Sequence, residues 1–344
     1  MMPHYTVGTM GSQDRARWDE FVERCPDATF FHRAGWRQVI EEGFGHPTWF
    51  MYAETDGRID AILPLAQVRS RLFGNTLSSL PFCVYGGIAA MHADAAAAVD
   101  QAAQQLAARL QVDHLEYRHM RPTQADWLHK NLYVTFRKPL HADPERNMLA
   151  IPRKQRAMVR KGIAGGLSST QDADTSRFFD CYADSVHRLG TPVFSRRYFA
   201  LLQRVFGDDC EVLCVQQAGR PVCAVLSFRF RDEILPYYGG GGVQARTLAG
   251  NDFMYWEVMR RACAQGCTLF DFGRSKYGTG SFAFKKNWGF EPQPLHYDYQ
   301  LHRGKQLKDV QPLNPRFQLF IKAWRLLPLP VANAIGPHIV RQLG

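Results

Sequence analysis

The stretch YAETDGRIDAILPL (52–65) decides the fold, because a second stretch, CVQQAGRPVCAVLSF (214–228), repeats its pattern. In both stretches an apolar run leads to a Gly-Arg pair and then to a second apolar run. Two strands joined by a tight turn have this pattern. We therefore predict a β-hairpin at each place, and two related structural units in one chain.

The likeness between the two halves continues on both sides of these hairpins. The further matches, in chain order, are FFHRAGWRQVIEEGFG (30–45) with PVFSRRYFALLQRVFG (192–207), CVYGGIA (83–89) with PYYGGGG (236–242), a helix over 94–110 with one over 252–265, and DHLEYR (113–118) with TLFDFG (268–273). Each unit then reads helix, hairpin, strand, helix, strand. A helix that crosses between two strands makes them parallel. An α/β fold follows, with mixed sheets flanked by helices.

The length of 344 residues suits two domains better than one. We predict a first domain over 1–145, a second domain with the active site over 146–302, and a helical tail over 303–344. The net charge of +10 favours anionic partners, such as nucleic acid, phosphorylated substrates or an anionic membrane surface.

Targeting signals and cysteine spacing give further expectations. The N-terminus has no apolar run typical of a signal peptide, and no stretch reaches the ~20 apolar residues of a transmembrane segment. The expected location is therefore the cytoplasm. The eight cysteines form no C-x-x-C pair, so we expect reduced, mostly buried thiols and no metal site.

A glycine-rich segment in the second half is a candidate ligand site. YYGGGGVQARTLAGNDFMYWEVMRRA (237–262) predicts a strand, a glycine-rich loop and a helix whose N-cap is Asn251 or Asp252. Glycines let backbone N–H groups approach a ligand, and a helix N-terminus favours negative charge. With Arg246 just ahead, the segment suits a pyrophosphate, a phosphate or a carboxylate. The alternative is a tight turn that only leads into the helix.

Two further features could contribute chemistry. Asp271 ends a predicted strand, where a carboxylate can transfer a proton or orient an amine; alternatively it pairs with Arg274 or caps the following loop. IPRKQRAMVRKGIAGG (151–166) is the most basic segment. On a helix its charges fall on two faces, Arg153 with Arg156 and Arg160, and Lys154 with Lys161. This helix is either solvated or an anion-binding face, because arginine forks match phosphates.

Motifs of covalent hydrolases, metalloproteases and P-loop NTPases are absent. Group transfer remains, because it can work by positioning the reactants and stabilising an oxyanion.

Three stretches resemble the FemAB-like (Fem/MurM-type) aminoacyltransferases, whose fold is a tandem pair of GNAT acyltransferase domains. They are RKQRAMVRKG (153–162), HRLGTPVFSRRYF (187–199) and DFGRSKYGTGSFAFKKNWGFEP (271–292). The last contains the motif F-K-x-x-x-G-F, from Phe284 and Lys285 to Phe290. The resemblance spans most of 20–300. GNDFMYWEVMRRA (250–262), FDFGRSKYGTGSF (270–282) and the tail (324–344) are similar to a narrower group associated with the exosortase (XrtA)/PEP-CTERM system.

The resemblance implies an acyltransferase or aminoacyltransferase that acts on an amine of a cell-envelope or exopolysaccharide precursor. The implied donor is acyl-CoA or aminoacyl-tRNA, without a metal, and tRNA is then a partner. The CoA loop of GNAT enzymes corresponds to residues 246–251, where Ala249 replaces a glycine and Asn251 occupies the last position. A non-catalytic module that binds a nucleotide-linked sugar or nucleic acid is the alternative function.

The resemblance also implies roles for individual residues. Lys285 and Arg274 bind an anionic group of the substrate, Asp271 orients or deprotonates the amine, and Tyr237 and Tyr238 line the substrate channel. The other residues assigned to substrate binding are Lys154, Arg156, Arg160, Arg188, Arg246, Asn251, Tyr277, Phe284 and Trp288. We also expect Phe284, Trp288 and Phe290 to anchor the far end of the 273–280 loop in the core.

The C-terminal tail mixes apolar and basic residues. They are Phe317, Phe320, Ile321, Trp324, Leu327 and Leu329, interspersed with Arg316, Lys322 and Arg325. A basic amphipathic helix of this kind lies on the anionic inner face of a membrane, or it packs on the second unit.

Overall fold

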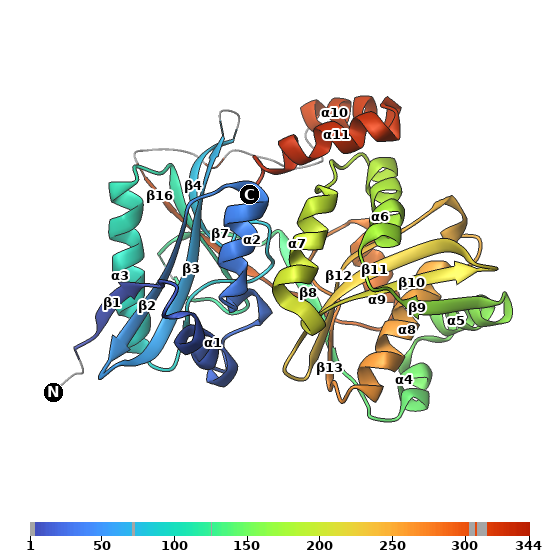
Figure 1. Cartoon of the computed structure of the whole chain (residues 1–344), viewed down its shortest axis with the longest axis horizontal. Coiled ribbons are helices and arrows are strands. Elements are labelled where there is room, and N and C mark those ends of the chain that lie inside the picture. Colours follow the sequence, from blue (N-terminus) through green and yellow to red (C-terminus); the bar gives the residue numbers. More distant parts are fainter. Residues whose placement is uncertain (1–3, 71–72, 125, 303–306, 308–314) are drawn as a thin grey trace. The chain divides into compact units, whose positions relative to one another are not determined.

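The structure, a computed structural model, describes residues 4–70, 73–124, 126–302, 307 and 315–344. The chain divides into two units, shown in Figure 1. The first unit consists of Met1–Tyr133, Pro294–Lys308 and Arg341–Gly344, and the second of Val134–Gln293 and Asp309–Val340. Within the described ranges, no helix is long and apolar enough to cross a membrane.

The first unit is a mixed sheet with helices on both faces. Its strands are β1 (Thr6–Thr9), β2 (Thr48–Thr55), β3 (Arg58–Ser70), β4 (Gly74–Ser79), β5 (Ala89–Ala90), β6 (His114–His119), β7 (Leu128–Lys130) and β16 (His296–Leu301). Its helices are α1 (Arg15–Arg24), α2 (Gly35–Phe44) and α3 (Ala93–Arg109). The strand order is β1-β2-β3-β4-β6-β16-β7, with β5 beside β3.

Alternation along β2 sends its side chains to the two faces of this sheet. Met51 and Ala53 belong to the buried cluster that includes α3, whereas the ring of Phe50 contacts Trp18 of α1, with centroids 5.3 Å apart. The helix α3 therefore covers one face, and α1 covers the other.

The second unit repeats this arrangement. Its strands are β8 (Tyr133–Pro139), β9 (Leu167–Gln171), β10 (Cys210–Gln217), β11 (Arg220–Phe230), β12 (Glu233–Gly241), β13 (Leu269–Asp271), β14 (Ser275–Lys276) and β15 (Pro292–Pro294). Its helices are α4 (Pro144–Ala150), α5 (Arg153–Ala164), α6 (Ser176–Leu189), α7 (Arg196–Phe206), α8 (Gly250–Ala264), α9 (Gly280–Asn287), α10 (Pro315–Leu326) and α11 (Leu329–Val340). The strand order is β14-β8-β13-β12-β11-β10-β9, with β15 beside β8.

Helices also cover both faces of the second sheet. Leu213, Val215 and Val225 form one buried cluster with residues of α5 and α8, including Val159 and Met259. On the opposite face α7 packs on β11, where the Phe206 and Phe228 ring centroids lie 5.8 Å apart. The apolar residues Phe253, Trp256 and Met259 of α8 are buried in the same cluster.

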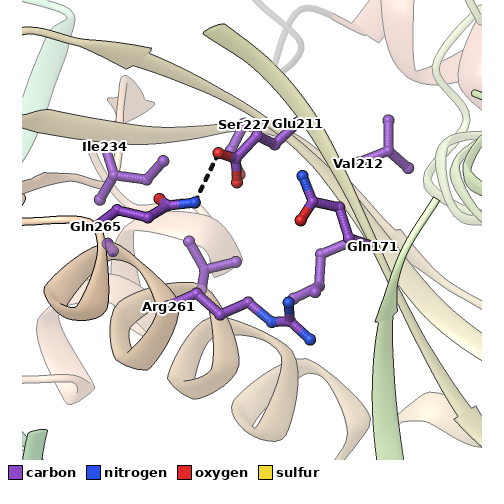
Figure 2. A pocket seen from close by; sticks show the side chains of 10 residues that line it. Gln171, Glu211, Val212, Ser227, Ile234, Arg261 and Gln265 are labelled. Carbon is purple, nitrogen blue, oxygen red and sulfur yellow. Dashed lines mark hydrogen bonds between the residues drawn. The ribbon is translucent and has the colours of Figure 1, made fainter. Parts of the chain in front are cut away.

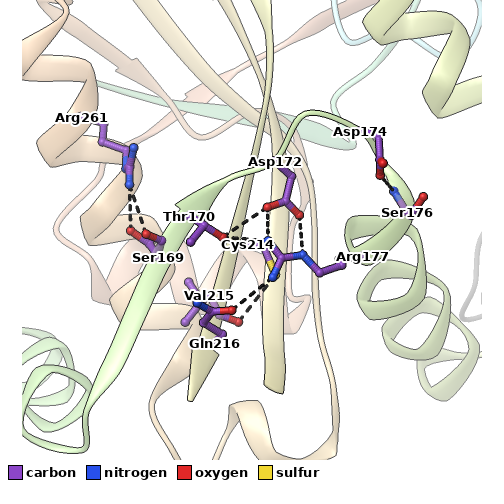
Figure 3. Close-up of polar contacts among 10 residues, drawn as sticks. All are labelled: Ser169, Thr170, Asp172, Asp174, Ser176, Arg177, Cys214, Val215, Gln216 and Arg261. Atoms are coloured by element: carbon purple, nitrogen blue, oxygen red, sulfur yellow. Dashed lines mark hydrogen bonds and ion pairs between the residues drawn. The ribbon is translucent and has the colours of Figure 1, made fainter. Parts of the chain in front are cut away.

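A polar network fixes β9 at the edge of this sheet (Figure 3). Arg177 of α6 pairs with Asp172, and donates to Thr170 Oγ1 at 2.8 Å and to Gln216 Oε1 at 3.2 Å. Arg261 of α8 donates to Ser169 Oγ at 3.2 Å. These two arginines therefore join β9 to the helices on both faces and are engaged in structural contacts.

The predicted internal duplication is confirmed at its two hairpins. The turn between β2 and β3 has φ of 49° at Asp56 and 74° at Gly57, and the turn between β10 and β11 has 48° at Ala218 and 77° at Gly219. Two successive positive φ values are typical of the turn that suits the twist of a two-residue hairpin. Each hairpin also has a register shift at the same distance from its turn. The predicted parallel pair of the second unit forms as β12–β13. In the first unit β6 pairs in parallel with β4, and not with the predicted strand at 83–89.

One central strand of each sheet comes from outside its own sequence repeat. In the first sheet β6 pairs with β16, which follows the whole second repeat, and in the second sheet β13 pairs with β8, which precedes it. The sequence boundaries placed β8 in the domain 1–145 and β16 in the domain 146–302. Strands pair through backbone hydrogen bonds, so the neighbour of a strand need not be near it in the chain.

Two details of the glycine-rich segment differ from the prediction. Gly239, Gly240 and Gly241 belong to β12 and not to a loop. A side chain at Gly240 would lie 2.7 Å from Tyr182 Cα of α6, so glycine lets this helix approach the strand. The prediction that Asn251 or Asp252 caps the helix is also wrong, because α8 begins at Gly250, after Ala249 in the left-handed conformation.

The segment of the first unit that was matched with β12 also differs from the prediction. The match of 83–89 with 236–242 predicts a strand, but residues 80–88 form turns and irregular backbone between β4 and β5. Leu80 and Phe82 have φ of 55° and 69° there, so the chain turns away from the sheet.

Candidate active site

The strands β12 and β13 of the second unit separate after two paired residues. They are in parallel register only at Glu233–Leu269 and Ile234–Phe270. Beyond this point β12 continues to Gly241 with β11 as its partner, and the register shifts at Leu226/Ser227. Along Leu235–Gly241, one edge of β12 therefore has no paired strand among the described residues, and its backbone groups can bind an extended ligand.

At the end of β13, Asp271 and Lys285 meet at one glycine. Asp271 Oδ1 accepts the backbone N–H of Gly273 at 2.8 Å. Lys285 Nζ of α9 donates to the carbonyl oxygen of Gly273 at 2.9 Å and to that of Arg274 at 3.1 Å. Gly273 has φ of 70°, a conformation that favours glycine. Three predicted site residues, Asp271, Arg274 and Lys285, are thus adjacent.

Burial changes the chemistry of Lys285. The loss of water around its amine lowers the pKa to about 7, against a smaller opposing effect of the Asp271 carboxylate. The rings of Phe136 and Phe272 lie with their centroids 5.7 Å and 5.9 Å from Nζ. At neutral pH this amine is therefore close to the midpoint of its titration.

Asp271 is fully buried, and its contacts come from residues that the sequence analysis did not identify. Thr135 Oγ1 of β8 donates to Oδ1 at 3.0 Å, and Arg137 Nε lies 3.4 Å from Oδ2. Arg137 also pairs with Glu233, the first residue of β12. Burial raises the pKa of Glu233, and Arg137 opposes this shift. No motif marks Thr135 or Arg137, because β8 lies far from β13 in the sequence.

Asp252 links three elements of the site. Its Oδ1 accepts Gln155 Nε2 of α5 at 3.1 Å and Trp288 Nε1 at 3.0 Å. Burial raises the pKa of Asp252, and these two hydrogen bonds oppose that shift. Trp288 and Phe290 are buried, which confirms that they anchor the far end of the loop, and Phe284 packs against the same cluster. Trp288 therefore contacts the core of the unit.

The end of β12 brings together two other predicted residues. Arg188 of α6 donates to the carbonyl oxygen of Gly241 and pairs with Asp184 at 3.1 Å. A side chain at Gly241 would lie 3.0 Å from Asn251 Oδ1, so Asn251 approaches the same strand end. Arg246 is exposed in the segment before α8. The first N–H groups of α8 adjoin these residues, and helix N-termini favour anions.

The predicted aromatic residues divide between two surroundings. Tyr238 is buried, with its hydroxyl 3.0 Å from that of Tyr198, and packs on the rings of α6 and α7. Tyr237 is half-buried beside Phe228. Tyr277 is half-exposed and contacts the Phe282 ring at the start of α9.

The predicted basic helix forms as α5. Lys154 and Arg160 are exposed, whereas Arg156 is half-buried and donates to the carbonyl oxygen of Leu149 at 2.9 Å. Gln155, on the buried side of the same helix, bonds Asp252 in the first turn of α8. The N-terminal end of α5, with Lys154, therefore lies beside the N-terminal end of α8.

A small pocket beside α8 has too little space to be a substrate site (Figure 2). It encloses about 10 Å³, the space of about one water molecule. Gln265 Nε2 bonds Glu211 Oε1 at 2.9 Å at its border. Ser227 Oγ and Arg261 Nε have no hydrogen-bond partner among the described residues, so this cavity suits a bound water.

The first unit differs from the second at the end of β4, the strand that corresponds to β12. Arg118 at the end of β6 forms a buried ion pair with Glu116, at 2.9 Å between Nε and Oε1. Its NH1 donates to the carbonyl oxygens of Leu80 at 3.2 Å and Cys83 at 2.8 Å. Arg118 thus fixes the 80–83 turn, which follows β4, whereas the corresponding strand of the second unit, β12, continues to Gly241.

The cysteines give no reactive site. All eight lie in described ranges, are buried and form no disulfide. Burial raises the pKa of Cys181 to about 12, so its thiol stays protonated at neutral pH. Among the described residues, no three His, Cys, Asp or Glu side chains are grouped as a metal site would require.

One family model matches part of the second unit. Residues 151–286 match the model of the acetyltransferase (GNAT) domain, and this range includes β12, β13 and Lys285. No curated protein sequence matches the chain.

Solved structures extend the likeness to both units. FemX has a TM-score of 0.66 at 13% identity, over 85% of this chain and 96% of that one. The C-terminal domain of a putative lysylphosphatidylglycerol synthetase from Agrobacterium fabrum has a TM-score of 0.57 at 13% identity, over 85% and 93%. A tandem GNAT protein of the clavulanic acid biosynthesis pathway has a TM-score of 0.53 at 11% identity, over 88% and 100%.

These likenesses confirm the predicted fold class. The chain consists of two tandem GNAT-like units with mixed sheets flanked by helices, and residues 151–286 of the second unit match the acetyltransferase (GNAT) domain model.

Proposed function

We propose that the second unit transfers an acyl or aminoacyl group from a phosphate-bearing carrier to an amine. The observation that carries this proposal is the separation of β12 from β13, with Lys285 and Gly273 at the point where the strands part. An open strand edge can hold the carrier's extended arm by backbone hydrogen bonds. The GNAT match over 151–286 supports the same reaction class.

In the proposed reaction the amine nitrogen attacks the carbonyl carbon of the donor. A C–N bond forms, the C–S bond of a thioester or the C–O bond of an ester breaks, and the proton of the amine passes to the leaving group or to water. Negative charge develops on the carbonyl oxygen in the transition state. Correctly placed donors at this oxygen lower the barrier.

Lys285 is the residue that we assign to an anionic oxygen of the substrate. In its ammonium form Lys285 has three N–H groups. Two of them donate to the carbonyl oxygens of Gly273 and Arg274, and the third can donate to the substrate. A negative charge that approaches this buried amine favours its protonated form and is itself stabilised, because little water screens the pair. Arg274 adjoins the same turn.

Asp271 is fully buried, so we assign it a positioning role. Its carboxylate holds the N–H of Gly273 and thereby orients the carbonyl that Lys285 contacts. A direct role as base would need contact with the amine.

The carrier's phosphates are proposed to bind where α5 and α8 begin. Gln155 ties α5 to Asp252 in the first turn of α8. Lys154 is therefore near this turn, which contains Asn251 and which Arg246 precedes in the chain. Both acyl-CoA and aminoacyl-tRNA carry phosphates, and GNAT domains usually take acyl-CoA. We therefore propose acyl-CoA as the first donor to test and aminoacyl-tRNA as the second. The amine would belong to a cell-envelope or exopolysaccharide precursor of the exosortase system, and the reaction would take place in the cytoplasm, as the sequence resemblance implies.

Thermal unfolding with each donor tests this proposal. A donor that binds only the folded chain at 100-fold excess over its Kd adds about 2.7 kcal/mol of stability. We expect one donor class to stabilise the chain and to yield an amide with a test amine. Stabilisation by neither donor class, together with stabilisation by a nucleotide-linked sugar or a nucleic acid, would instead favour a non-catalytic binding module.

A further inference from the structure

The two C-terminal helices pack on the second unit by one side only. Both α10 and α11 contact α6. Trp324 of α10 and Gly336 of α11 are buried, and a side chain at Gly336 would lie 2.9 Å from the backbone nitrogen of Val193. Arg325 donates to the carbonyl oxygen of Leu189 at 3.1 Å. These contacts confirm that the tail packs on the unit, and they fix which sides of the helices face outward.

The outward side is mostly apolar. Phe320 and Arg325 of α10 and Pro330 of α11 are exposed. Two further sets of residues are also exposed: Leu319, Lys322, Ala323 and Leu326 on α10, and Val331, Ala334, Ile335 and His338 on α11. Both sets follow the spacing i, i+3, i+4, i+7, so each is one continuous stripe. Leu326 is 85% exposed and Leu319 is 71% exposed. We call these eight residues the outer face.

Helices that face water usually carry charged residues on the outer side, which is the opposite of this pattern. The charge that is present has one sign. Residues 310–344 include four Lys or Arg and no Asp or Glu. Lys322 lies within the α10 stripe, between Leu319 and Leu326.

We propose that the outer face binds the surface of an anionic phospholipid bilayer. Exposed leucine and isoleucine side chains enter the boundary between headgroups and acyl chains, and lysine and arginine remain at the phosphates. Each basic residue near an anionic leaflet contributes about 1 kcal/mol. A second copy of the chain fits less well, because a symmetric dimer would bring Lys322 and its neighbouring basic residues against themselves. This inference does not depend on the reaction catalysed by the second unit.

Cosedimentation of the full chain with vesicles tests the proposal. The vesicles contain phosphatidylcholine alone or phosphatidylcholine with phosphatidylglycerol. The test variant is Leu319→Gln with Leu326→Gln and Ile335→Gln, which removes apolar contacts without changing charge. The matched control is Leu128→Gln with Leu149→Gln and Val243→Gln, because these side chains are also exposed but lie outside the outer face. Circular dichroism checks that both variants remain folded.

We expect binding to vesicles with phosphatidylglycerol, a partition coefficient at least about tenfold lower for the outer-face variant, and no change for the control. Equal binding by the outer-face variant would overturn the proposal, because charge alone would then explain the attraction. Absence of vesicle binding would also overturn it. Light scattering tests whether the outer face instead binds a second copy of the chain. A dimeric wild type and a monomeric outer-face variant would show this and would also overturn the proposal.

Discussion

Asp271 and Lys285 bind the two backbone polar groups of the same residue, Gly273. The carboxylate of Asp271 accepts the N–H of Gly273 at 2.8 Å, and the amine of Lys285 donates to the carbonyl oxygen of Gly273 at 2.9 Å. A carboxyl group and a buried amine thus fix the turn that follows β13. The turn and the open edge of β12 are therefore positioned together.

The burial of Lys285 predicts a pH dependence of stability. Its pKa falls from 10.5 to about 7 on folding, so between these values the unfolded chain binds more protons than the folded chain. The cost of burying the ammonium is present in full below about pH 7 and disappears as the pH rises towards 10.5. We expect the unfolding free energy of wild type, relative to Lys285→Met, to increase with pH by roughly 1.4 kcal/mol per unit at most.

Urea denaturation of both proteins at several pH values between 6 and about 10 measures this difference. Subtracting the two curves cancels the titration of all other groups. A difference that stays flat across the range would show that Lys285 keeps its ordinary pKa in the folded chain.

Gly240 predicts a steric effect. Alanine there would place Cβ 2.7 Å from Tyr182 Cα and 3.0 Å from the Cys181 carbonyl oxygen, both backbone atoms of α6. We expect Gly240→Ala to lower the unfolding free energy by about 1–3 kcal/mol. Gly242→Ala is the matched control, because its Cβ would meet nothing closer than 3.6 Å, and a change within about 0.5 kcal/mol is expected. Equal losses in the two variants would mean that the close approach of α6 is not the cause.

The buried ion pair of the first unit predicts a third result. Burial alone would raise the pKa of Glu116, but Arg118 lowers it below its ordinary value. Glu116→Gln leaves the buried guanidinium without its counter-charge, so we expect a loss of about 3–5 kcal/mol. Thermal or urea unfolding of this variant measures the loss. A change below about 1 kcal/mol would indicate that the pair is open to water.

The sequence predicted the local features of the fold well. The hairpin turns, the helices over 94–110 and 252–265 and the parallel strand pair of the second unit follow from residue patterns that act within a few positions. The pairing of β8 with β13 and of β16 with β6 could not be predicted in this way, because the paired strands lie far apart in the sequence. The glycines at 239–241 were assigned to a loop because the close approach of α6 to Gly240 is a tertiary contact.

The candidate site was predictable for the residues near the F-K-x-x-x-G-F motif. Asp271, Arg274 and Lys285 are close in sequence and meet at one turn. Arg137 and Thr135 contact Asp271 from β8, more than a hundred residues away, and nothing in their local sequence marks them. The same applies to Gln155, whose bond to Asp252 depends on the packing of α5 on α8.

The rate of amide formation in the Lys285→Met variant tests the central claim most directly. The measurement uses the donor that stabilises the folded chain, an amine acceptor and folded protein, with Lys286→Met as control because Lys286 is the exposed neighbour on α9. We predict a rate about 100-fold or more below wild type for Lys285→Met, and a rate within about twofold for Lys286→Met. A rate near wild type for Lys285→Met, or an equal fall in both variants, would contradict the placement of the transfer site where β12 and β13 part.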